Sequence, residues 1–94
     1  MATDYKSVIE KQLKLPVAEI PIIELVDSLI TYGYESRASD IHINPAEDKI
    51  SIRLRIDGIL YDTFVFPKSI QPEIITRIKV LAALRTDEHQ AAQD

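Results

Sequence analysis

The feature that most constrains this chain is a strict alternation of apolar and polar residues between positions 50 and 56. Isoleucine or leucine occupies every even position there, while Ser51, Arg53 and Arg55 occupy the odd ones. Successive side chains of a strand point to opposite faces, so this period of two predicts a half-buried strand. The Asp57-Gly58 pair that follows is the strongest short signal for a two-residue hairpin turn.

Two further strands are expected beside this one. Isoleucines at positions 41 and 43 alternate with Asp40 and His42, and a turn-forming Asn-Pro-Ala-Glu-Asp segment follows them. Residues 59–66 run back from the hairpin, and Phe-Pro-Lys-Ser ends that run. The sequence therefore predicts a three-stranded antiparallel meander.

Segments with helical periodicity flank the predicted sheet. From Pro21 to about Glu35 the apolar residues form one stripe, and Pro21 suits a first turn because its missing N–H costs little there. After the strands, Ser69 is a candidate N-cap of another helix, with Pro72 in its first turn. The expected buried stripes are Ile22, Leu25, Val26, Leu29 and Ile30 in the earlier helix and Ile70, Ile74, Ile78 and Leu81 in the later one.

The two ends of the chain carry weaker patterns. Residues 5–13 have apolar side chains at helical intervals, which predicts a short amphipathic helix or a frayed arm. The polar tail 85–94 lacks such a stripe, and we expect it to be irregular. The resulting division is an N-terminal helix or linker at 1–18, an α+β domain at 19–86 and a linker at 87–94. The predicted fold class is two-layer α+β, with helices covering the isoleucine face of the meander.

Composition narrows the class of function. A chain of 94 residues makes one small domain, and an apolar fraction of 46% is ordinary for a folded protein. The net charge of −4 disfavours a general nucleic-acid binder, because phosphate backbones attract excess Lys and Arg. There is no cysteine for a metal site and no Gly-x4-Gly-Lys-Ser/Thr phosphate loop, so these residues alone do not make a self-sufficient enzyme. The apolar runs are too short to span a bilayer and no signal peptide is visible, so we expect a cytosolic protein.

The alternation also gathers ionic side chains on the outer face of the sheet, which is the face opposite the isoleucines. A two-residue turn at Asp57-Gly58 pairs Arg55 with Leu60, and it pairs Arg53 with Asp62. The second pair places opposite charges across the hairpin, a contact worth a few tenths of a kcal/mol to about 1 kcal/mol. The same alternation assigns Asp40, His42, Phe64 and Phe66 to this face. Arginines, a histidine, acids and aromatic rings together predict a docking surface.

Each of these residues also has a purely structural interpretation. Arg53 and Arg55 fit solvent-side strand positions with cross-strand partners equally well, and Asp40 fits a brace for the turn between helix and strand. A lone histidine such as His42 is more often a packing residue than a ligand or a base. A zinc site would need partners, and the other histidine, His89, lies in the polar tail. Two phenylalanines in one strand are more often core than interface.

Three segments resemble one protein family. They are ASDIHINP at 38–45, IRLRIDG at 52–58 and RIKVLAAL at 77–84. In this order and spacing they are similar to the domain that precedes the motor domain in the type II secretion and type IV pilus assembly ATPases. The resemblance covers about residues 20–94.

The chain departs from the usual family string at a few positions. Asn44 stands where the family usually has Glu, while Gln90 and Ala92 replace the usual Arg and Pro of the segment that enters the motor. The resemblance implies that the whole protein is a cytosolic, hexameric RecA-like ATPase, peripheral at the inner membrane. Such a protein docks on inner-membrane platform proteins, its own motor and neighbouring subunits. ATP and magnesium are then expected in a C-terminal motor domain that residues 87–94 would join.

The resemblance also implies roles for individual residues. Arg53 is expected to reach toward the nucleotide phosphates, as an arginine finger does, with Arg55 and Lys68 as further phosphate contacts. The residues expected at the domain interface are Asp40, His42, Phe64, Phe66, Arg77 and Lys79. The alternative is a free-standing α+β interaction module without ATPase activity, in which Phe64 and Phe66 matter more than Arg53.

Overall fold

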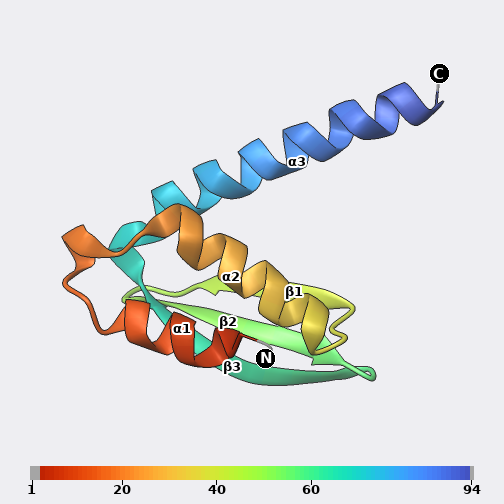
Figure 1. The fold of residues 1–94 in the computed structure, drawn as a ribbon. Coiled ribbons are helices and arrows are strands. Elements are labelled where there is room, and N and C mark those ends of the chain that lie inside the picture. The colour runs from red at the N-terminus through yellow and green to blue at the C-terminus, as the bar shows by residue number, and fades with distance from the viewer. Residues whose placement is uncertain (1–2, 94) are drawn as a thin grey trace.

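The computed structural model describes the backbone of residues 3–93 and the side chains of residues 3–84. The main elements are α1 (Tyr5–Leu13), α2 (Ile22–Glu35), β1 (Asp40–Pro45), β2 (Lys49–Ile56), β3 (Ile59–Pro67) and α3 (Gln71–Gln93). Two short 3-10 helices, η1 (Val17–Glu19) and η2 (Lys68–Ile70), lie between them. Figure 1 shows α1 and α2 against one face of the sheet, and α3 projecting beyond it. The predicted two-layer α+β class is confirmed.

The sheet is antiparallel with the strand order β1-β2-β3. Around the hairpin turn, Arg55 pairs with Leu60 and Arg53 pairs with Asp62, as the sequence predicts. The two turn residues, Asp57 and Gly58, both have positive φ, at 52° and 80°. A type I′ turn requires this conformation at both central positions, which is why Asp-Gly fits there.

A β-bulge at Thr63 reverses the faces of β3. Asp62 pairs with Arg53, whereas Phe64 pairs with Ile52, which directly precedes Arg53 in β2, so Thr63 is an extra residue without a partner. Beyond the bulge, Phe64 and Phe66 point into the core, where they are 7% and 0% exposed. The prediction that these two phenylalanines lie on the outer face is therefore wrong.

The hydrophobic core joins all three helices to the sheet. The predicted stripe of α2 is buried at Leu25, Val26 and Leu29, whereas Ile30 at its edge stays 43% exposed. The core cluster consists of Ile9, Ile20, Leu25, Val26, Leu29, Ile50, Ile52, Phe64, Phe66, Ile70 and Ile74. Because full burial of one such side chain contributes roughly 1.5–3 kcal/mol, this cluster is the main stabilising contact between the layers.

Helix α2 lies close to the sheet at Gly33. A Cβ atom added there would lie 3.0 Å from Ile41 Cδ1 and 3.3 Å from its Cγ1. In the preceding position, the Tyr32 ring meets the Phe64 ring edge-on, with centroids 5.6 Å apart. Because Gly33 has no side chain, α2 can lie close to the sheet, and this position brings Tyr32 into contact with Phe64.

Helix α3 differs from expectation at both ends. Ser69 lies inside η2, so the chain is already helical there and the predicted N-cap at Ser69 is wrong. The α-helix begins at Gln71, with Pro72 in its first turn as expected. It continues to Gln93, so the tail predicted to be irregular has a helical backbone. Alanine, glutamine and glutamate are good helix formers, which explains a helical backbone there although the sequence of the tail has no apolar stripe.

The N-terminal segment forms a helix that packs on the domain. Ile9 of α1 is fully buried in the common core. Asp4 caps this helix, because its carboxylate accepts bonds from Ser7 Oγ at 2.8 Å and from Ser7 N at 3.3 Å. The hydrogen bond from the Ser7 hydroxyl, and to a smaller extent that from the Ser7 backbone N–H, holds the pKa of Asp4 below its ordinary value.

Candidate functional site

Three cross-strand rows form the outer face of the sheet. The rows are Asp40–Arg55–Leu60, His42–Arg53–Asp62 and Asn44–Ser51–Val65. Side chains directly opposite one another on one face have Cβ atoms about 4.5–5.5 Å apart. Each arginine therefore has an acid in its own row, and the predicted residues Asp40, His42, Arg53 and Arg55 do lie together.

Arg55 is held by hydrogen bonds inside the domain. Its Nε donates to Asp40 Oδ2 at 3.1 Å, and its Nη1 donates to the Gly58 carbonyl oxygen at 3.3 Å. Ser39 Oγ donates to the same Asp40 oxygen at 3.1 Å. The side chain thus ties β1 and the hairpin turn to β2. Since Arg55 and Asp40 are 38% and 49% exposed, the pair contributes at most about 1 kcal/mol.

Arg53 has a less complete set of partners. Its Nε lies 2.8 Å from Asp62 Oδ1, but the carboxylate is off the N–H direction, so this buried Nε–H has no hydrogen-bond acceptor. Within residues 3–84 the two terminal nitrogens of Arg53 donate to no protein acceptor. The side chain is 41% exposed. Arg53 therefore keeps donors and charge available for an anionic acceptor from outside the domain.

A shallow hollow of about 380 Å³ surrounds Arg53 on the outer face. Asp62 and Thr63 line one side of it, so the bulge helps to shape it. Lys49 also lines it and adds a second positive charge. Lys68 does not line the hollow, but it directly follows Pro67, which pairs with Lys49. Lys49 and Lys68 therefore lie near the end of the sheet that is remote from the hairpin turn.

His42 belongs to the row of Arg53 and lies two residues from Asp40 along β1. Its Nε2 is 3.9 Å from Asp40 Oδ2, which is too long for a hydrogen bond, and the side chain is 37% exposed. Among the residues that the structure describes, no cluster of three or more His, Asp or Glu side chains could hold a metal ion. His42 thus has a place beside Arg53 and near Asp40 on the outer face, without a metal-binding cluster around it among the described side chains.

Arg77, a predicted interface residue, is paired within the domain. Its Nη2 donates to both Asp27 oxygens at 3.1 Å, and its Nε donates to Asp27 Oδ1 at 3.4 Å. The Arg77 side chain is only 22% exposed. This contact joins α3 to α2, so Arg77 has a structural role, whereas Lys79 is exposed on α3.

We expect Asp27 and Arg77 to be coupled in the free energy of unfolding by about 0.5–1 kcal/mol, because the pair is bidentate and partly shielded. The measurement is urea unfolding of Asp27→Ala, Arg77→Ala and the double variant. The Arg53 and Asp62 pair is the control, and it should couple less because its carboxylate is 83% exposed and misaligned. A coupling near zero at Arg77 would leave that residue free for a partner.

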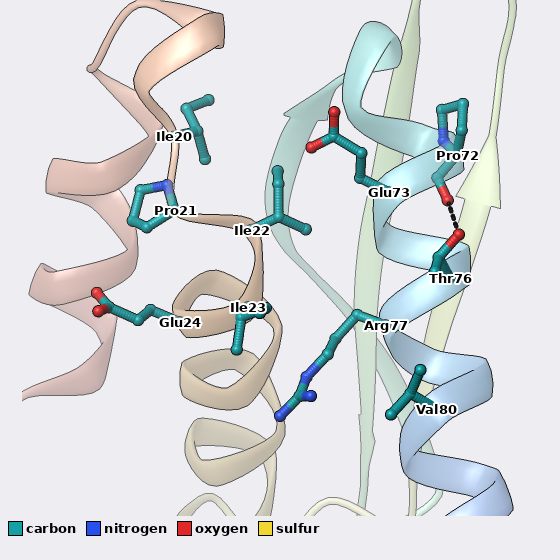
Figure 2. A pocket seen from close by; sticks show the side chains of 10 residues that line it. All are labelled: Ile20, Pro21, Ile22, Ile23, Glu24, Pro72, Glu73, Thr76, Arg77 and Val80. Atoms are coloured by element: carbon teal, nitrogen blue, oxygen red, sulfur yellow. Dashed lines mark hydrogen bonds between the residues drawn. The ribbon is translucent and has the colours of Figure 1, made fainter.

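The sequence patterns did not reveal a groove on the helical side of the domain. It lies between the start of α2 and the first turns of α3, with a volume of about 820 Å³ (Figure 2). A signal was present, because Ile23 falls outside the buried stripe of α2 and is 58% exposed. Only the placement of α3 beside α2 turns that isoleucine into part of a concave surface.

The chain matches known proteins over most of its length. The family described as Type II/IV secretion system protein matches residues 17–94. Type II secretion system protein E of Xanthomonas campestris is 40% identical over 77 residues, covering 82% of this chain. The type IV pilus assembly ATPase TfpB of Acinetobacter baylyi is 38% identical over 78% of the chain, and the type II secretion system ATPase E of Vibrio cholerae is 34% identical over 81%. This chain belongs to the Type II/IV secretion system protein family.

The matched region is a small part of each relative. The chain spans 14% of the length of the Xanthomonas protein, 12% of the Acinetobacter protein and 15% of the Vibrio protein. In the described part of the chain, no helix combines the length and the apolarity that crossing a membrane requires. The similarity therefore places one domain in the family, and the activity of the whole protein is a separate question.

Proposed function

We propose that this domain precedes the motor domain of a type II secretion or type IV pilus assembly ATPase and couples ATP hydrolysis to protein secretion or pilus assembly. It docks on its own motor and directs Arg53 toward the bound ATP phosphates. Membership of the family supports this proposal, as does the ATPase activity named for two of the relatives. The observation that carries the residue-level part is the 41% exposed Arg53 side chain, whose terminal nitrogens donate to no acceptor within residues 3–84.

The residues of the outer face fit a phosphate group. A guanidinium presents several donors in a planar fork, which matches phosphate oxygens better than a single ammonium does. Arg53 supplies that fork, Lys49 adds positive charge in the same hollow, and Lys68 follows Pro67, the partner of Lys49. When ATP and magnesium are bound in the motor, they supply the reacting phosphate and part of the charge compensation. Arg55 ranks after Arg53, because a phosphate contact would require Asp40 to release it.

The remaining part of the proposal concerns docking. Asp40, His42 and Lys79 remain accessible for a contact with the motor or with a neighbouring subunit, whereas Phe64 and Phe66 belong to the core. The whole protein is then a cytoplasmic hexamer, held at the inner membrane by secretion or pilus platform proteins. In that arrangement the domain moves as a rigid body and closes over the nucleotide.

The transcript beyond Asp94 provides the first test. We expect a Gly-x4-Gly-Lys-Ser/Thr loop within roughly the next 250 residues, because phosphate binding requires a motor domain that this chain lacks. We also expect chain 1–94 alone to release no phosphate from ATP above the buffer rate. A stop codon after Asp94 would instead favour a free-standing interaction module, and robust turnover by the purified chain would contradict the proposal.

A further inference from the structure

The groove between α2 and α3 is apolar at its base. Figure 2 shows Ile22 and Ile23 beside the start of α2, with Val80 projecting from α3 toward them. Ile23 and Val80 are 58% and 45% exposed. Single exposed apolar residues are common, but these two line one concavity of about 820 Å³, with the Arg77 side chain drawn between them in Figure 2. That volume lies within the range of about 300–1,000 Å³ found for binding pockets, so the groove has room for several apolar side chains.

The walls of the groove determine how a ligand can be recognised. Both walls are helices, whose C=O groups are used within the helices, whereas the first N–H groups of α2 have no side-chain cap from the described residues. Thr76 donates its hydroxyl hydrogen to the Pro72 carbonyl oxygen at 2.9 Å, so that hydrogen is also used. A peptide strand would find no sheet edge here. Apolar side chains therefore provide most of the contact surface, and the mode that fits such a surface is an amphipathic helix lying in a groove.

The charges at the groove favour a basic ligand. Arg77 lines it, but both oxygens of Asp27 neutralise that guanidinium. Glu24 in the first turn of α2 and Glu73 in the first turn of α3 are exposed, and within residues 3–84 neither is paired with a cation. Helix N-termini stabilise acids at such positions, yet both carboxylates remain accessible. The groove thus combines an apolar base with an acidic rim.

We propose that this groove binds a basic amphipathic helix of a partner protein, with two or three aliphatic anchors and flanking Lys or Arg. The anchors fill the space above Ile23 and Val80, while the flanking cations pair with Glu24 and Glu73. This site lies on the helical layer of the domain and uses none of the residues of the outer face of the sheet. It therefore goes beyond the proposed phosphate contact, and it can fail without affecting that proposal.

The test measures binding of a designed peptide to the chain. The probe is a fluorescein-labelled 14-residue helix with Leu at positions i, i+4 and i+7 and Lys on the remaining face. We expect fluorescence anisotropy to show binding that Ile23→Asp or Val80→Asp weakens by about tenfold or more. The double variant Glu24→Lys with Glu73→Lys should reverse the preference, and should bind instead the matched peptide that has Glu in place of Lys.

The control separates specific docking from general attraction to an acidic protein. Glu47→Lys with Asp48→Lys makes the same change in net charge at the exposed turn between β1 and β2, and should alter binding of the Leu/Lys peptide by less than about twofold. Circular dichroism should confirm that every variant is folded. Equal losses of peptide affinity in the two double variants would overturn the proposal. So would NMR chemical-shift changes, on addition of the peptide, that lie away from Ile23 and Val80. Self-association of the chain through the groove in sedimentation runs would overturn it in favour of a second copy.

Discussion

Replacement of Arg53 by alanine is expected to lower ATP turnover of the full-length protein by on the order of a thousandfold or more. An arginine that stabilises developing phosphate charge from a neighbouring domain contributes an effect of this size. The fold should change little, because Arg53 meets a misaligned Asp62 carboxylate that is 83% exposed, and such pairs are worth at most about 1 kcal/mol. Phosphate release at saturating ATP measures the first effect, and urea unfolding measures the second.

Two further variants test whether the guanidinium itself matters. Arg53→Lys keeps the charge but loses the planar fork, so it should restore only a small part of the turnover. Lys49→Ala removes a positive charge from the same hollow and should have a much smaller effect than Arg53→Ala. If Arg53→Ala retained turnover within about twofold of the parent, the phosphate role of this residue would be refuted, while docking of the domain would stay open.

Replacement of Phe66 by alanine should lower the free energy of unfolding by about 3–5 kcal/mol. The side chain is fully buried, and its ring centroid lies 6.4 Å from that of Phe64, so truncation removes aromatic contacts and leaves a cavity. Small domains are stable by only about 5–15 kcal/mol in total, so this variant should be close to unfolding at physiological temperature. Urea unfolding of chain 1–94 provides the measurement.

The neighbouring residue supplies a matched control. Val65 lies on the outer face and is 56% exposed, so Val65→Ala should change the free energy of unfolding by less than about 0.5 kcal/mol. This comparison also decides between the two roles expected for the phenylalanines. A Phe66→Ala variant that kept its stability but lost a protein partner would support the interaction-module alternative and contradict the burial of that ring.

The hairpin is the part of the fold that the sequence predicts most completely. Alternation identifies the inner face of β2, and Asp57-Gly58 fixes the turn, so the register from Arg53 to Asp62 follows without further information. The acid opposite Arg53 could therefore be predicted as well, because these hairpin features depend on local geometry alone. The pairing of Asp40 with Arg55 depends on the register of β1 against β2, which the hairpin does not set.

Features that depend on tertiary contacts could not be predicted in the same way. In β3, strict alternation puts Leu60, Asp62 and Phe64 on one face, and only packing of the aromatic rings against the helices selects a bulge at Thr63 instead. The conflict is visible in the sequence, since strict alternation places two large rings on a polar face. The pairing of Arg77 with Asp27 likewise depends on how α3 lies beside α2, which no periodicity specifies.

The bulge at Thr63 also affects how the chain can vary in length. Insertions and deletions usually accumulate in surface loops, because a lost residue within a strand exchanges its two faces. In β3, loss of Thr63 would instead bring Asp62 and Phe64 into continuous pairing with β2 and keep the core face unchanged. Relatives one residue shorter at this point would keep the core, but their sheet would lack the irregularity that shapes the hollow beside Arg53.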